Sequence, residues 1–129
     1  TIFCSVYFQT WLPVLFIVLP NFYGKTLVML MGLTQHAGLQ EDIKDHRLTT
    51  RTVYLNPIFS FLYWHMEYHV EHHMFPQVPS HNLKKLHALI KDQMPAARKG
   101  LWGAYKEIVP ALVKQAKDPK YKIPSAIPN

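Results

Sequence analysis

The first 33 residues form an almost unbroken apolar run, TIFCSVYFQTWLPVLFIVLPNFYGKTLVMLMGL, in which Lys25 is the only charged residue. A helix needs about 20 apolar residues to cross the hydrocarbon core of a bilayer, and hydropathy of this strength is typical of membrane segments. We predict one span over residues 2–20, ending near Pro20, and a second apolar helix that starts at Gly24 and ends at His36. A buried hairpin in a soluble protein is the alternative interpretation.

The polar remainder of the chain predicts helices separated by loops. Residues 40–56 begin with a charged stretch that has no apolar periodicity, and we interpret them as a polar loop. Helical patterns follow over residues 57–116, whereas residues 117–129 contain three prolines and should form a flexible tail. The predicted fold is therefore all-α, with membrane-embedded helices over residues 1–39 and a cytosolic or interfacial helical cap over residues 57–116.

The first helix of this cap has a clear start and a clear stop. Asn56 is a favourable N-cap, and Pro57 suits the first helical position, where its missing N–H costs nothing. Pro76 disfavours helical geometry at the residue before it, so we predict that this helix runs from Pro57 to about Met74.

The C-terminal part of the chain is strongly basic. From residue 81 onward there are ten Lys or Arg residues against three Asp or Glu residues. Leucines at helical spacing among lysines predict a basic amphipathic helix after Ser80, and a further helix over residues 101–116 should be kinked or split at Pro110. The positive-inside rule places this region in the cytoplasm, where anionic lipid headgroups account for the lysines and no nucleic acid is needed.

Four histidines lie within nine residues of the stretch YWHMEYHVEHHMFPQVP, and they are His65, His69, His72 and His73. On one helix they would fall within an arc of about 100°. Glu67 and Glu71 would point away from that face. Imidazoles at this spacing can converge on iron, zinc or copper, so we predict a metal site with the two glutamates in supporting roles.

Other site classes fit the spacing poorly. A zinc protease needs Glu directly after the first His of H-E-x-x-H, and HMEYH and HVEHH do not provide it. Ser60 and Ser80 lie in no nucleophile elbow. Cys4 is the single cysteine, so an internal disulfide and a cysteine-rich zinc module are excluded.

The stretch YHVEHHMFPQVPSHNL, together with the upstream QHAGL, resembles the membrane-bound fatty acid desaturase and hydroxylase superfamily of histidine-box di-iron enzymes. The resemblance covers about residues 30–90. It implies that the HxxHH box supplies metal ligands and that His36 is a further ligand; the ligand set is His36, His69, His72 and His73. We expect His65 and His81 to hydrogen bond to these ligands or to serve in packing, His46 to be solvated, and His87 to be interfacial or structural.

The first two histidine boxes of the superfamily are absent from this chain. Two irons need more imidazoles than the four assigned here, so histidines upstream of Thr1 would have to complete the centre. We therefore interpret the chain as the C-terminal portion of a longer enzyme, starting part-way through it, and expect it to be inactive by itself.

The resemblance implies an integral, multi-pass membrane oxidoreductase of lipid metabolism whose C-terminal region is cytoplasmic. It would use two iron ions and O2 to introduce a double bond into a long acyl chain, with electrons from a cytosolic donor of the cytochrome b5 or ferredoxin type. Hydroxylation of an alkane or lipid is the alternative within the same superfamily. A non-catalytic, zinc-binding membrane protein is the alternative from another class.

Overall fold

The computed structural model describes residues 2–128 and is largely helical, with 62% helix and 3% strand. This confirms the predicted all-α class. The chain divides into two compact units, Thr1–Met31 and Gly32–Asn129, which are described separately below.

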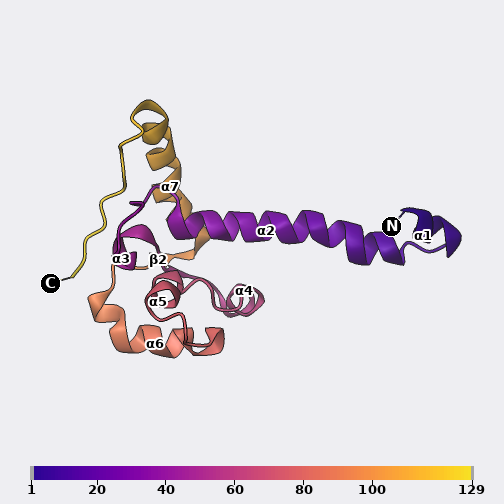
Figure 1. The fold of residues 1–129 in the computed structure, drawn as a ribbon, viewed down its shortest axis with the longest axis horizontal. Coiled ribbons are helices and arrows are strands. Elements are labelled where there is room, and N and C mark those ends of the chain that lie inside the picture. Colours follow the sequence, from indigo (N-terminus) through magenta and orange to yellow (C-terminus); the bar gives the residue numbers. More distant parts are fainter. Residues whose placement is uncertain (1, 129) are drawn as a thin grey trace. The chain divides into compact units, whose positions relative to one another are not determined.

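The N-terminal unit contains helix α1 (Ile2–Tyr7), the π-helical turn η1 (Val14–Val18) and most of helix α2 (Leu19–His36), which appears in Figure 1 as one long helix. The segment Val14–His36 is one continuous helical run, so the predicted helix end near Pro20 is wrong. The reason is local. Pro20 has no N–H to donate to the carbonyl four residues earlier. The wider π-helical turn η1, which lies just before Pro20, lets the helix continue through it.

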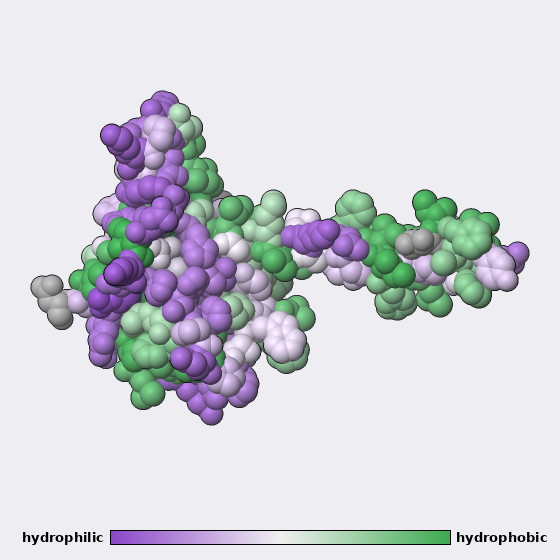
Figure 2. Space-filling view, viewed as in Figure 1, coloured by the Kyte–Doolittle hydropathy of each residue, from purple (hydrophilic) through white to green (hydrophobic). Residues whose placement is uncertain are grey.

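Val14–His36 is the one helix in residues 2–128 that is long and apolar enough to cross a membrane. Most of its apolar side chains are exposed, and apolar colours dominate the N-terminal unit in Figure 2. Two polar side chains bond within the helix, since Asn21 Nδ2 donates to the Ile17 carbonyl at 2.6 Å and Thr26 Oγ1 to the Phe22 carbonyl at 2.7 Å. Internal bonding of this kind suits a lipid environment.

The C-terminal unit has short elements, two strands and one long helix. In chain order they are α3 (His46–Thr49), β1 (Val53–Tyr54), α4 (Pro57–Leu62), α5 (His69–Met74), the 3₁₀ turn η2 (Ser80–Asn82), α6 (Leu83–Ile90), the 3₁₀ turn η3 (Lys91–Gln93), β2 (Arg98–Lys99) and α7 (Gly100–Lys117). The two strands pair in parallel, with Val53 opposite Arg98. The helix predicted after Ser80 is confirmed as η2 followed by α6.

Helix α7 supplies the core of this unit. Ala104, Ile108 and Ala111 recur at helical spacing and are buried. The first two pack with Val53 of β1. Pro110 is exposed and does not split the helix, because α7 continues through it to Lys117.

The segment after α7 has no helix or strand through residue 128, yet it is anchored to the core. Ile123 is buried with Leu39 and Ala111, and its backbone N–H donates to the Gly38 carbonyl at 2.7 Å. Gly38 has a positive φ of 78°, and a Cβ there would lie 2.7 Å from Ile123 Cδ1. Glycine is therefore required at this contact.

The predicted helix from Pro57 to Met74 is interrupted. Its start is confirmed, because the Asn56 side chain accepts a hydrogen bond from the Phe59 N–H at 2.9 Å. Helix α4 then ends at Leu62, and Trp64 and His65 both adopt the left-handed conformation with φ of 56°. A left-handed non-glycine residue costs about 1 kcal/mol or more, so tertiary contacts must offset it.

These contacts centre on Ser60. Its buried hydroxyl donates to a carboxylate oxygen of Glu67 and lies 2.8 Å from His65 Nδ1. Because the chain turns here, α5 begins afresh at His69, and His65 does not share a helix face with the HxxHH box.

Candidate metal centre

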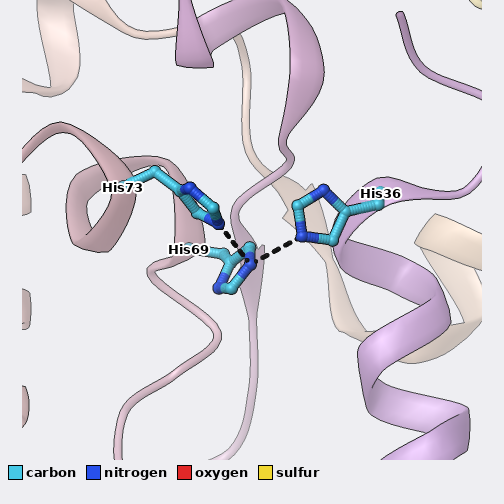
Figure 3. A group of neighbouring side chains, drawn as sticks. All are labelled: His36, His69 and His73. Atoms are coloured by element: carbon cyan, nitrogen blue, oxygen red, sulfur yellow. Dashed lines mark hydrogen bonds between the residues drawn. The ribbon is translucent and has the colours of Figure 1, made fainter. Parts of the chain in front are cut away.

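Three imidazoles from two elements converge on one point. His36 is the last residue of α2, and His69 and His73 lie one turn apart on α5. The Nε2 atom of His69 is 2.8 Å from Nε2 of His36 and 3.0 Å from Nε2 of His73. Figure 3 shows these rings pointing toward one another, and the three nitrogens lie within 4.8 Å of one another.

The His36 ring is oriented by the backbone of α3. Its Nδ1 atom is 3.1 Å from the Thr49 carbonyl oxygen, which can only accept a hydrogen bond. Nδ1 of a neutral His36 therefore carries the proton, and Nε2 presents a lone pair to the other two histidines. Metal-bound histidines commonly have this arrangement, in which the second nitrogen donates to a carbonyl that fixes the ring.

Hydrogen bonds alone do not satisfy His69. Its Nε2 atom faces two other Nε2 atoms but has at most one proton to share, and its buried Nδ1 atom has no hydrogen-bond partner among the described residues. Buried polar atoms are normally paired. Three Nε2 atoms meet here with too few protons between them, so their lone pairs need an electron-pair acceptor. A metal ion at Nε2 would provide one.

The environment favours the neutral form of His69 and His73. Burial, together with the neighbouring His36 and His73, lowers the pKa of His69 to about 3. Burial and His36 also lower the pKa of His73 below its usual range. Neutral imidazole is the form that binds metal, so both rings are available as ligands at physiological pH.

The spacing of the nitrogens fits a shared metal. Imidazole nitrogens bind zinc at about 2.1 Å, so two of them on one ion lie about 3–4 Å apart. The distances of 2.8 and 3.0 Å are close to this range. A site of nitrogen ligands suits iron, zinc or copper better than calcium or magnesium.

His72, the remaining predicted ligand, lies beside this group. Its ring centroid is 5.9 Å from those of His69 and His73, and its nitrogens are not among the three that converge. Its side chain is partly exposed. Its assignment as a ligand stays a prediction.

The two predicted supporting histidines lie elsewhere in this unit. His65 contacts Ser60. His81 is exposed, and both histidines border an apolar pocket of about 290 Å³ that Phe61 and Trp64 also line. Within residues 2–128, neither His65 nor His81 hydrogen bonds to the three clustered histidines. Their supporting roles stay predictions.

The structure also brings His46 to this site, whereas the sequence led us to expect a solvated residue. Its ring centroid is 5.1 Å from that of His73. The chain returns here because the Arg51 N–H donates to the Gln35 carbonyl at 2.8 Å. The charged sequence around His46 carries no periodicity that would reveal this long-range contact.

Arg51 holds the end of α2 that bears His36. Its guanidinium donates to the carbonyls of Thr34 at 2.8 Å and Ala37 at 3.3 Å, and it pairs with Glu107 of α7 at 3.3 Å. Cations at a helix C-terminus satisfy unpaired carbonyls and complement the helix dipole. Arg51 thus links α2 to the core helix beside the site.

Comparisons with known proteins show which family this chain belongs to. The family model described as fatty acid desaturase matches residues 1–105. A protein of Oryza sativa subsp. japonica named sphingolipid delta(4)-desaturase DES1-like is 28% identical over 89 residues, which cover 67% of this chain and 25% of that protein. The chain thus spans about a quarter of the length of this relative.

No solved structure matches the chain. The family match includes both α2 and α5, the two elements that carry the clustered histidines, and it covers most of the sequence. The chain therefore belongs to the fatty acid desaturase family, whose members are membrane-associated oxidoreductases of lipid metabolism.

Proposed function

We propose that this chain is the C-terminal part of an O2-dependent di-iron desaturase that introduces a double bond into a long acyl chain. The observation that carries the proposal is the convergence of His36, His69 and His73, with Nε2 distances of 2.8 and 3.0 Å around His69, inside the region that matches the family. Iron held by such imidazoles would supply the O2-driven oxidation of an unactivated C–H bond.

The residues of this chain contribute ligands and their orientation. His36, His69 and His73 would hold one iron, and His72, which directly precedes His73 on α5, would be a ligand of the second. The Thr49 carbonyl keeps Nε2 of His36 free to bind. Histidines in other parts of the complete protein would have to complete the set.

The partners follow from the reaction. Removing two hydrogens from neighbouring carbons while reducing O2 to water requires two electrons from outside, so we propose a cytosolic donor of the cytochrome b5 or ferredoxin type. Exposed lysines on the C-terminal unit, including Lys84 and Lys85 of α6, suit an acidic carrier. The apolar helix Val14–His36 supports a membrane location. We further propose that the complete enzyme crosses the membrane several times and has its C-terminal region in the cytoplasm.

Product analysis tests the reaction type. The complete protein, reconstituted with lipid substrates, O2 and an electron donor, should give products that have lost two hydrogens by mass spectrometry. Products that have gained one oxygen would identify the hydroxylase alternative.

Metal analysis separates both enzyme proposals from a zinc protein. Anaerobically purified complete protein should contain about two irons per chain. Stoichiometric zinc and no iron would overturn the proposed function.

A further inference from the structure

Helix α5 carries a buried carboxylate on the side opposite its metal-binding histidines. At 100° per residue, Glu71 lies about 160° from both His69 and His73. Its side chain is completely buried, with 0% of its surface exposed. A carboxylate in this environment requires hydrogen-bond donors, because burying an unpaired charge is very costly.

Two side chains from other elements provide those donors. The hydroxyl of Thr52 donates to Glu71 Oε2 at 2.7 Å. His87 of α6, itself buried, places Nδ1 2.5 Å from Glu71 Oε1. Both carboxylate oxygens are therefore bonded, one to the chain just before β1 and the other to α6.

The network extends one residue further. The Tyr54 hydroxyl of β1 lies 2.7 Å from Nε2 of His87. With His87 Nδ1 donating to the carboxylate, Nε2 of the neutral ring accepts from the tyrosine. Every group of this hydrogen-bond network then has a partner; its members in order are Tyr54, His87, Glu71 and Thr52. A fully satisfied network of this kind fixes the relative positions of its members.

Helix α5 needs such anchoring. It has only six residues, and its N-cap, Tyr68, makes no side-chain capping hydrogen bond. A helix this short does not hold its conformation by itself. Rotation of α5 would displace His69 and His73 together, so the contacts of its opposite face determine where their nitrogens point.

We propose that Glu71 is a positioning residue for the metal centre, acting through His87 and Thr52 to set the orientation of α5. This inference rests on the proposed function, because it assumes that the histidines of α5 bind metal. Glu71 binds neither metal nor substrate. Its contribution is hydrogen-bond geometry, and its charge is not the essential property.

The test is Co²⁺ titration of the metal-free complete protein, with the visible d–d absorption band as the readout of ligand geometry. We expect Glu71→Ala and His87→Ala each to weaken Co²⁺ binding by about tenfold and to change the band, as loss of residues that orient metal ligands commonly does. Glu41→Ala is the matched control, because Glu41 is highly exposed and pairs with Lys122 at the surface.

The conservative variant separates geometry from charge. In Glu71→Gln the amide oxygen can accept from Thr52, while the amide N–H can donate to His87 Nδ1 if that ring changes tautomer and donates to Tyr54. We expect binding within about threefold of wild type and an unchanged band. The double variant Glu71→Ala/His87→Ala should lose no more affinity than Glu71→Ala, since both changes break one link.

Thr52→Val and Tyr54→Phe keep the inference testable if the alanine variants do not fold. Each removes one hydroxyl from the network at nearly constant volume. Each should weaken Co²⁺ binding and shift the Co²⁺ band away from its wild-type position, while the far-UV circular dichroism spectrum stays the same. Unchanged affinity and band in these variants, or a Glu71→Gln variant as impaired as Glu71→Ala, would overturn the inference.

Failure of the proposed function gives a different result. If wild-type protein binds neither iron nor Co²⁺, the metal centre itself is wrong and the positioning role falls with it. If wild type binds metal but hydroxylates its substrate, the proposed reaction is wrong and the role of Glu71 stands.

Discussion

The properties of the candidate centre depend first on a single ring. His69 is the central histidine of the cluster, because its Nε2 atom is within 3.0 Å of the corresponding atoms of both His36 and His73. Burial keeps it neutral. The same burial leaves its Nδ1 without a partner in the part of the chain that the structure describes.

Replacement of this ring gives the first prediction. We expect His69→Ala to lower the iron content of the complete protein to less than about a tenth of wild type, because the change removes the proposed ligand that contacts both other histidines. Metal analysis of protein purified anaerobically measures this. Glu41→Ala serves as the control, since Glu41 is highly exposed and lies outside the cluster. Equal iron in both variants would exclude His69 as a ligand.

Among the elements, the end of α2 needs support from the rest of its unit to place His36. Arg51 provides it through two carbonyls of the last turn and through Glu107 of α7. Glu107 is shared, because Arg98 of β2 also donates to both of its oxygens at 2.8 and 2.6 Å. One carboxylate of α7 thus contacts both β2, which directly precedes α7, and Arg51, which lies much earlier in the sequence.

Loss of Arg51 should therefore destabilise the fold. We expect Arg51→Met to reduce the free energy of unfolding by about 3 kcal/mol, because it leaves helix carbonyls and Glu107 without a buried partner. Thermal unfolding in detergent would report this as a lower melting temperature. Arg47→Met is the comparison, since Arg47 pairs with its neighbour Asp45 near the surface, and it should melt like wild type. A wild-type melting temperature for Arg51→Met would contradict the linking role.

The same carboxylate predicts a pH dependence. The hydrogen bond from Arg98, with the charge of Arg51, lowers the pKa of Glu107 below its usual value of 4.5. The unfolded state therefore binds more protons than the folded state in this range, so the stabilisation is complete above about pH 4.5 and is lost as the pH falls through the folded pKa. Glu107→Gln should lose less stability than wild type between about pH 5 and pH 3. Parallel melting curves for the two proteins would argue against this.

At the scale of the whole molecule, residues 2–128 contain one helix suited to a bilayer, and the C-terminal unit is basic. The chain spans about a quarter of the length of a desaturase relative. We expect the C-terminal unit of the complete protein to face the cytoplasm.

Labelling of a unique cysteine tests this orientation. Cys4→Ser removes the natural cysteine of this chain, and Lys120→Cys introduces one in an exposed position after α7. In a complete protein with its other cysteines also replaced, a membrane-impermeant maleimide should react in sealed vesicles whose cytoplasmic face is outward. Reaction in vesicles of the opposite orientation would place this unit on the other side of the membrane.

Much of this protein is determined by local sequence. The apolar run predicts a membrane helix, Asn56 and Pro57 start α4 as expected, and the i, i+4 spacing places His69 and His73 on one helix face. These features could be predicted because helix capping and side-chain periodicity depend on residues within one or two turns.

Tertiary structure decided what those elements do together. The sequence suggested one helix through His65 to the box, but buried hydrogen bonds of Ser60 stabilise two left-handed residues and end α4 early. His36 and His69 are 33 residues apart, and their contact depends on the path of the loop between them. The same path brings His46 beside His73. Periodicity fixes which residues share a face, whereas only the packed chain determines which faces meet.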